Sequence, residues 1–445
     1  MFPRVAVEKV GENPDAAIHR ILAGFSDIVR RIGECEKVFM KINAVYFHPH
    51  LHTSLCLIES VVNYIRSVDP KKNIYLMENC SQATFTRLCF SAIGLNAFAR
   101  RLSVRCLYLD EGKWVNVEMD EGDGKTSIRF PQILHKELLV NRSRNLYINM
   151  PILKTHCQAQ MTAGIKNQMG LLYDSDKAKN HNHRLHQKLV DILKLIKPDF
   201  TVVDALKVLE RGPTCPKKFL EERLHERDLF VGGEDVVAVD AVCAGIIGHD
   251  PFSIKHVALA AQQGLGVAAL DAIEVEPAMP VCHETIPWES ESHFPKSIRF
   301  VIGKERACYE GCVGFAEQTV ELLVNEKNVP ENFTDVPLTI VTGRGFEIDQ
   351  IEGLQEPIIL LGKCACDELL ETLRDKYSRI DVANTCGRFD DIFALTARNL
   401  KVNTAELYPG SPFEILRQFL LGRVHGLDFK RYKIPRQLKA RAKKR

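Results

Sequence analysis

Short apolar runs and longer amphipathic segments alternate along the first 110 residues. The runs have the length and the β-branched content of strands, and the longer segments repeat their apolar positions with helical spacing. Asn13-Pro14 marks the start of the first helix, and Thr53 or Ser54 is the expected cap of the second. The predicted strands are 3–10, 37–45, 73–80 and 102–110, and the predicted helices are 15–31 and 53–68. This order predicts an α/β fold with right-handed crossovers.

The middle of the chain continues the same pattern. A strand over 145–156 ends in polar residues, and the next segment, 160–172, is predicted to be helical. A histidine-rich loop, "NHNHRLH" at 180–186, follows. The remaining predicted elements are a helix over 187–196, strands over 199–206 and 227–234, and helices over 234–248 and 256–266.

The composition changes at about Glu274, where proline and polar residues become frequent. A second strand–helix alternation begins after this stretch, with strands at 298–302, 338–342, 358–361 and 380–382 and helices at 315–324, 367–376 and 390–398. We therefore predict a mixed or parallel-sheet α/β domain over 1–273 and a smaller Rossmann-like α/β domain over 298–425, with a linker over 274–297 and a basic tail over 426–445.

Composition narrows the possible partners. The length of 445 residues predicts two or three domains. The chain is 45% hydrophobic and 26% charged, and its net charge of +2 does not indicate a polyanionic partner. The start of the chain lacks a signal-peptide pattern, and no apolar run reaches the ~18 residues of a membrane span. We expect a cytoplasmic protein that binds neither nucleic acid nor membrane. The basic segment 430–445 is interpreted as a solvated terminus, with contact to nucleic acid or to an anionic membrane as the alternatives.

Five of the 14 cysteines follow predicted strands in the last third of the chain. Cys308 and Cys312 follow the strand at 298–302, Cys364 and Cys366 follow 358–361, and Cys386 follows 380–382. Because the carboxyl ends of parallel strands meet at one edge of a sheet, we expect these thiols to lie close together. In a reducing compartment such a group indicates metal ligation or redox chemistry.

A 4Fe-4S cluster needs four ligands, usually thiolates. Cys308, Cys312, Cys364 and Cys386 are the predicted set, with Cys366 as an alternate or fifth ligand. Three alternatives remain open: a zinc site, although structural zinc sites usually show two C-x-x-C-like knuckles; a redox dithiol at Cys364 and Cys366; and buried, inert cysteines.

A second group of residues that can bind ligands or transfer protons follows the central strand. Two lysines and an imidazole around an apolar strand are costly to bury without an anionic partner, so we expect an anionic small molecule here. The predicted catalytic residues are Lys154, His156, Lys166 and Asp204, and the predicted binding residues are Lys41, Asn167, His181, His183 and Asp240. The histidines could instead belong to a mobile loop, and Asp204 and Asp240 could be helix caps or strand-end hydrogen-bond acceptors.

The sequence resembles the domain of unknown function 362 family. The resemblance rests on "INMPILKTHCQAQMTAGIKNQMG", "LKLIKPDFTVVDAL", "GPT" and "EDVVAVDAVCAGIIGHDP", which occur in the expected order, and it covers roughly residues 37–266. The family has no settled general activity. Many members carry a ferredoxin-like module with two 4Fe-4S clusters, which needs closely spaced C-x-x-C runs. This chain has no such run, so its C-terminal unit with five cysteines is expected to replace that module.

The same central segment is similar to the lactate racemase family, in which such residues hold a nickel-pincer cofactor. His156 and Lys166 enclose Ala163-Gly164, and a histidine cluster follows. This resemblance implies that Lys166 would anchor the cofactor, while His156 with His181 or His183 would ligate metal or move protons. The chain departs from that family in lacking a THR-P-type histidine motif near residues 80–110.

These observations favour an iron–sulfur protein, an oxidoreductase or another redox-coupled enzyme that acts on an anionic small molecule and exchanges electrons with a partner. One alternative is a metal-dependent isomerase or racemase centred on Lys154, His156 and Lys166. Another is a cluster carrier without catalytic activity.

Overall fold

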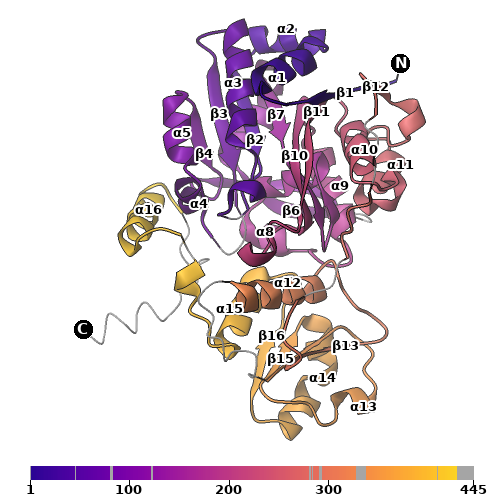
Figure 1. The fold of residues 1–445 in the computed structure, drawn as a ribbon. Helices are drawn as coiled ribbons and strands as arrows, with labels where there is room; N and C mark the ends of the chain where they lie inside the picture. The colour runs from indigo at the N-terminus through magenta and orange to yellow at the C-terminus, as the bar shows by residue number, and fades with distance from the viewer. Residues whose placement is uncertain are drawn as a thin grey trace.

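The computed structural model describes residues 2–45, 47–80, 84–121, 124–279, 282, 284–289, 293–326, 337–407 and 409–427. Within these residues the strands form a ten-stranded sheet, a four-stranded sheet and a two-stranded hairpin. Figure 1 shows the four-stranded sheet below the larger one, with helices packed on both. The chain is therefore an α/β protein, as predicted.

The larger sheet is mixed. Its main path runs in the order β12 (Glu274–Glu276), β1 (Arg4–Lys9), β11 (Leu224–Gly233), β10 (Phe200–Gly212), β7 (Asn145–Met150), β2 (Lys37–Ile42), β3 (Asn73–Glu78) and β4 (Arg105–Tyr108). Strands β10, β7, β2, β3 and β4 are mutually parallel, whereas β11 runs antiparallel to both β10 and β1. β8 (Ile152–His156) pairs with β10 and with the short β9 (Gln160–Thr162). The first three residues of the predicted linker thus form an edge strand of this sheet.

Side-chain alternation along the strands buries both faces of the sheet. In β2, Val38 and Met40 point to one helical layer and Phe39 to the other. The first layer comprises α1 (Pro14–Ala23), α2 (Ser26–Glu34), α3 (Leu55–Val68), α4 (Thr86–Ala92) and α5 (Leu95–Arg101). The second comprises α9 (Leu185–Leu195), α10 (Val236–Ile246) and α11 (Lys255–Gln262). The single helix predicted over 15–31 is two helices, and Ser54 is the cap of α3.

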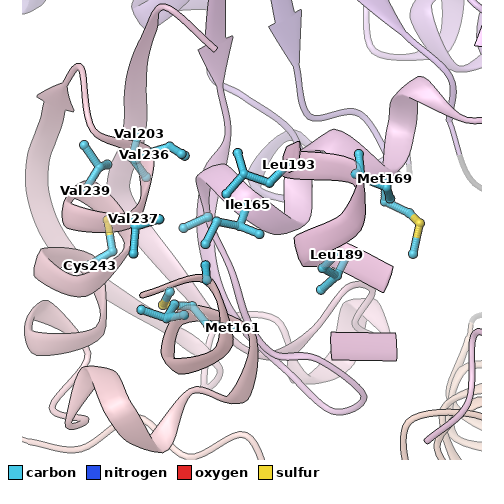
Figure 2. Close-up of a cluster of buried hydrophobic side chains, with 14 of the residues drawn as sticks. Met161, Ile165, Met169, Leu189, Leu193, Val203, Val236, Val237, Val239 and Cys243 are labelled. Atoms are coloured by element: carbon cyan, nitrogen blue, oxygen red, sulfur yellow. The ribbon is translucent and has the colours of Figure 1, made fainter. Parts of the chain in front are cut away.

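The predicted helix over 160–172 is wrong. The segment begins as β9 and continues as the short helix α7 (Gly164–Asn167) and a 3-10 turn over Gln168–Leu171. Asp240 explains the late helix start, because its carboxylate accepts the backbone N–H groups of Gly164 at 2.6 Å and Ile165 at 2.9 Å. Figure 2 shows Ile165 in the core between the side chains of α9 and those of α10. This anchor fixes the position of the next residue, Lys166.

The predicted elements also omitted one hairpin, β5 (Trp114–Glu121) with β6 (Gly124–Pro131), whose ladder is antiparallel.

The smaller sheet is wholly parallel, in the order β13 (Ile298–Ile302), β14 (Leu338–Thr342), β15 (Ile358–Leu361) and β16 (Ile380–Ala383). Helices α12 (Cys312–Asn325) and α15 (Phe389–Asn399) cover one face, and α13 (Ile348–Ile351) and α14 (Lys363–Lys376) cover the other. These strands match the predicted ranges closely. The helices begin earlier than predicted, so Cys312 is the first residue of α12, and Cys364 and Cys366 lie in the first turns of α14. A further helix, α16 (Pro412–Val424), follows.

Helices α12 and α15 lie between the two sheets in Figure 1. A buried ion network joins α12 to the larger sheet: Glu321 accepts from Arg211 at 2.8 Å and from Arg223 at 2.8 Å. The side chains of all three residues are at most 5% exposed. The network therefore ties the four-stranded unit to the ten-stranded one in a site from which water is largely excluded.

We predict that Glu321→Gln destabilises the protein by about 3–5 kcal/mol, because it leaves two buried guanidinium groups without their shared carboxylate. Urea unfolding followed by circular dichroism measures this difference. The matched control is Glu317→Gln, whose carboxylate is 3.4 Å from Arg211 and 25% exposed. We expect less than about 1 kcal/mol for the control. Equal losses in the two variants would contradict the importance of the network.

The predicted basic tail lies outside the described residues from 428 onward. In the described part of the chain, none of the helices has both the length and the apolar character that a membrane crossing requires.

Candidate functional site

A cavity of about 170 Å³ lies where the larger sheet meets α12 and α15. On one side it is lined by residues that end or directly follow strands of the larger sheet, among them Asn43, Glu78 and His156. On the other side it is lined by Phe315 of α12 and Phe393 of α15. The carboxyl ends of parallel strands are the usual ligand-binding edge of such sheets. Five of the residues predicted from the sequence line this one cavity: Lys154, His156, Lys166, Asn167 and His181.

Two lysines give the cavity its positive charge. Lys154 is 1% exposed and donates to the backbone carbonyl of Leu51 at 2.7 Å and to Asn43 Oδ1 at 3.3 Å. Lys166 has no hydrogen-bond or ion-pair partner among the described residues. Burial lowers the pKa of Lys154 to about 7 and that of Lys166 to about 8, and each shift also contains repulsion from neighbouring lysines. A bound anion would offset both the burial of the two ammonium groups and the repulsion from neighbouring lysines.

A buried ion pair lies at the wall of the cavity that is formed by the larger sheet. Lys41 lies 2.8 Å from Glu78, and neither side chain is more than 3% exposed. Asn167 accepts from Lys41 at 3.4 Å and from Asn43 at 3.2 Å. Gly170 is required here, since a Cβ at this position would lie 2.1 Å from Glu78 Oε1. Lys41 therefore acts through its neighbours, while Glu78 and Asn167 themselves reach the cavity.

Two histidines contact their backbone neighbours through the same ring nitrogen, Nδ1, but in opposite hydrogen-bond roles. His156 Nδ1 accepts the N–H groups of Gln158 at 3.1 Å and Ala159 at 3.2 Å, so in the neutral ring Nε2 carries the proton. His181 Nδ1 lies 2.9 Å from the carbonyl oxygen of Glu310 and must donate to it, which leaves Nε2 as an acceptor. Burial is the largest cause of the lowered pKa of both rings, and that of His181 falls to about 3. The cavity wall thus holds one neutral donor and one neutral acceptor.

Three predicted residues lie away from the cavity. Asp204 accepts the backbone N–H of Ser54 at 2.7 Å and so supports the start of α3. Asp240 holds the start of α7, as described above. Burial raises the pKa of both carboxyl groups, to about 7 for Asp240. The side chain of His183 is exposed.

Several cavity residues were missed by the sequence reasoning. Lys177 lines the cavity, where it pairs with Asp174 at 3.3 Å and donates to two backbone carbonyls. Gln158 and Gln318 also line it, at 2% and 6% exposed. Among the described residues, both polar atoms of Gln158 and Nε2 of Gln318 have no hydrogen-bond partner. An isolated glutamine carries no motif or periodicity, so only the fold could reveal these two. Lys177 precedes the histidine-rich loop by a few residues, and only this closeness in sequence could have indicated that it belongs to the cavity.

The C-terminal thiols form a second group at the edge of the smaller sheet. Cys312 donates a hydrogen bond to Cys386, which helps to lower the pKa of Cys386 to about 6 and to raise that of Cys312. Cys308 interacts electrostatically with both Cys364 and Cys386. Cys366, at 4% exposed, packs with Val301, Leu360 and other apolar residues between the sheet and α14. The fifth cysteine is therefore a core residue, and the other four share the strand-end edge.

Backbone N–H groups point at three of these sulfur atoms. Cys308 accepts from His183, Cys312 from Gly387 and Cys386 from Lys363. Gly387 has a φ of +67°, and a Cβ there would lie 2.6 Å from the carbonyl oxygen of His181. The loop that carries Cys386 is thus pressed against the backbone of a cavity residue. The two sites are neighbours that share the His181–His183 segment.

The arrangement also bears on which metal would fit. Among the described residues, no group of three or more His, Cys, Asp or Glu side chains is placed to hold a single metal ion. A zinc ion with ~2.3 Å bonds draws its sulfur ligands to about 4 Å from one another. A 4Fe-4S cluster spans more space and holds its ligand sulfurs roughly 6–7 Å apart. The hydrogen bond between Cys312 and Cys386 brings those two sulfurs closer to the zinc spacing than to the cluster spacing, so the cluster and zinc both stay predictions for this edge.

Comparison with known proteins gives a family and two similarities. Residues 38–245 match the model of the family described as "Domain of unknown function (DUF362)". The "Thylakoid-associated protein sll1697" of Synechocystis sp. is 32% identical over 146 residues, which are 31% of this chain and 42% of that protein. The chain thus spans about two fifths of the length of that relative. The lactate racemase apoprotein from Thermoanaerobacterium thermosaccharolyticum is 9% identical with a TM-score of 0.38, over 84% of this chain and 75% of that one.

The matched residues include the quoted blocks "INMPILKTHCQAQMTAGIKNQMG" and "LKLIKPDFTVVDAL" and the lysines and histidines of the cavity. Residues 38–245 of the chain therefore match the DUF362 family, in agreement with the resemblance seen in the sequence.

Proposed function

We propose that the protein is a redox-coupled enzyme that binds an anionic small molecule in the cavity and holds a 4Fe-4S cluster on Cys308, Cys312, Cys364 and Cys386. The observation that carries the proposal is the adjacency of the two sites. His181 lines the cavity, and the carbonyl oxygen of the same residue lies against Gly387, next to Cys386. A cluster at this place would be close to a molecule in the cavity.

The positive charge of the cavity supports an anionic ligand. Lys154 and Lys166 face the cavity without a carboxylate partner among the described residues, while Lys41 and Lys177 are paired with Glu78 and Asp174. The free positive charge thus belongs to the two lysines that a ligand could reach. His156 can donate from Nε2 to a substrate oxygen, and His181 can accept a proton at Nε2.

The cluster is supported by thiol chemistry. A pKa of about 6 makes Cys386 largely a thiolate at neutral pH, which is the form that binds iron. N–H groups directed at ligand sulfurs are also a known control of cluster potential. When bound, the cluster would exchange single electrons with the molecule in the cavity or with an external partner.

Anaerobic purification of the whole chain tests the proposal. We expect a brown protein that absorbs near ~400 nm and contains about four irons per chain. Dithionite should bleach the absorption, because a reducible cluster takes up an electron. Colourless, iron-free protein from anaerobically grown, iron-supplemented cells would overturn the cluster. Zinc in place of iron would overturn it as well and would assign the thiols to a structural metal.

A further inference from the structure

We infer that the substrate is an amphipathic anion: a carboxylate or phosphate head group attached to an aromatic or similarly flat apolar body. This inference rests on the anion site proposed above and adds the class of molecule that fits it. It follows from the unequal walls of the cavity, which come from different parts of the fold.

The wall from the larger sheet is polar and cationic. Lys154 and Lys166 stand on it beside His156, and none of the three is matched by an anion within hydrogen-bond distance among the described residues. Two ammonium groups and a neutral imidazole donor can together hold the oxygens of one carboxylate or phosphate. The head group is therefore assigned to this wall.

The wall from the smaller unit is aromatic. Phe315 lies 5.5 Å from Phe389, centroid to centroid, and Phe389 lies 5.6 Å from Phe393. His181 continues the row, since its ring centroid is 4.6 Å from that of Phe315. Phe315 and Leu322 are seven residues apart on α12, so they face the cavity from the same side of that helix. The rings are tilted to one another by 37° to 53°, and together they offer an aromatic apolar surface that a small hydrophilic anion would leave uncovered.

The amides between the walls are placed to form hydrogen bonds with a molecule in the cavity. Both polar atoms of Gln158 and Nε2 of Gln318 are buried and have no hydrogen-bond partner in the part of the chain that the structure describes. Buried amides without partners are costly, and a bound molecule with polar atoms near the two walls would satisfy them. Gln158 comes from the larger unit and Gln318 from α12, so the same molecule would contact both.

The volume agrees with a molecule of this class. At roughly 10–15 Å³ for each water position, a cavity of about 170 Å³ holds on the order of ten water-sized groups. A single acetate or phosphate ion would fill less than half of it, whereas an aromatic ring with a short acidic side chain would fill most of it.

Calorimetry on the full chain with four probes tests the inference: phenylacetate, phenyl phosphate, acetate and benzyl alcohol. We expect at least one of the two aromatic anions to bind ~10-fold or more tightly than acetate, because its ring leaves water for the phenylalanine wall. Benzyl alcohol, which has the ring without the charge, should bind at least ~10-fold more weakly than that aromatic anion. Phe393→Ala should remove the preference for the aromatic anion over acetate, and Phe413→Ala, whose ring is 75% exposed on α16, should retain it.

Equal affinities for acetate and the aromatic anions would overturn the amphipathic class while leaving the anion site in place. Equal affinities for benzyl alcohol and the tighter-binding of the two aromatic anions would overturn the assigned head group. Absence of binding by all four probes would overturn the class and the anion site together. None of these readouts depends on iron, so a failure of the proposed cluster would be seen separately, in the metal content.

Discussion

Cys386→Ser protein, purified without oxygen, will lose most of its iron, and Cys366→Ala protein will keep it. Both residues lie within the last third of the chain, and both were candidates by sequence spacing. A hydrogen bond from Cys312 helps to hold the pKa of Cys386 at about 6, whereas Cys366 packs in the apolar cluster with Val301 and Leu360. We therefore expect the sulfur of Cys366 to stay in that cluster and not to replace a ligand at the edge.

Iron per chain and absorption near ~400 nm measure this difference, and we expect a loss of about four irons in the first variant and none in the second. Cys308→Ser, Cys312→Ser and Cys364→Ser should resemble Cys386→Ser. Circular dichroism of each iron-free variant shows whether the fold is retained. Equal iron in the Cys366 and Cys386 variants would contradict the assignment, as would loss of iron from Cys366→Ala alone.

The second large effect is expected from Lys166→Met, which should make the ligand-free protein more stable and weaken its binding of anions. The ammonium group has no partner among the described residues, and burial lowers its pKa to about 8. Methionine has a similar shape and needs no partner, so we expect a gain of about 1–2 kcal/mol at pH 7, measured by urea unfolding. Binding of sulfate, whose charge does not change over the range tested, should weaken at least ~10-fold.

The pH dependence of the same variant gives an independent measurement. The pKa of this lysine is lower in the folded chain than its ordinary value of ~10.4, so the unfolded chain binds the proton more tightly. The cost of the buried charge is therefore fully present below about pH 8 and disappears as the pH rises toward ~10.4. The advantage of Lys166→Met should accordingly shrink between pH 7 and pH 9.5. Sulfate binding by the unmodified protein should weaken from pH 6.5 to pH 9, because Lys154 and Lys166 lose their protons.

Lys177→Met is the matched control for charge removal at the same cavity. Lys177 pairs with Asp174 and donates to the carbonyls of Asn79 and Cys80, so its loss should destabilise the protein. A gain of stability in both lysine variants would show that any charge removed from this region helps. It would refute the view that Lys166 is retained for a ligand.

The strand–helix order, the parallel second sheet and the grouping of four cysteines at its edge follow from local patterns, and they were predictable for that reason. Apolar runs of strand length alternate with amphipathic segments, and the carboxyl ends of parallel strands lie on one edge wherever the crossovers are regular. The family resemblance rests on contiguous blocks such as "INMPILKTHCQAQMTAGIKNQMG", and the residues of one such block were enough to find Lys154, His156, Lys166 and Asn167.

Only the tertiary structure could decide the rest, because it depends on residues distant in sequence. Asp240 converts a predicted helix over 160–172 into a strand and a short turn of helix by accepting two N–H groups from 75 and 76 residues away. The sequence placed Cys366 beside Cys364, but only Cys366 packs from α14 into the apolar cluster against the sheet. The cavity itself has one wall from each unit, and no local pattern of the chain shows that Lys154 and Phe315 line the same cavity. By itself, the sequence determined which lysines and histidines lie at the ends of strands. The packing of α12 and α15 beneath the larger sheet decided that those residues face an aromatic wall and lie next to the thiols. The physical reason is that only packing brings together groups more than a hundred residues apart.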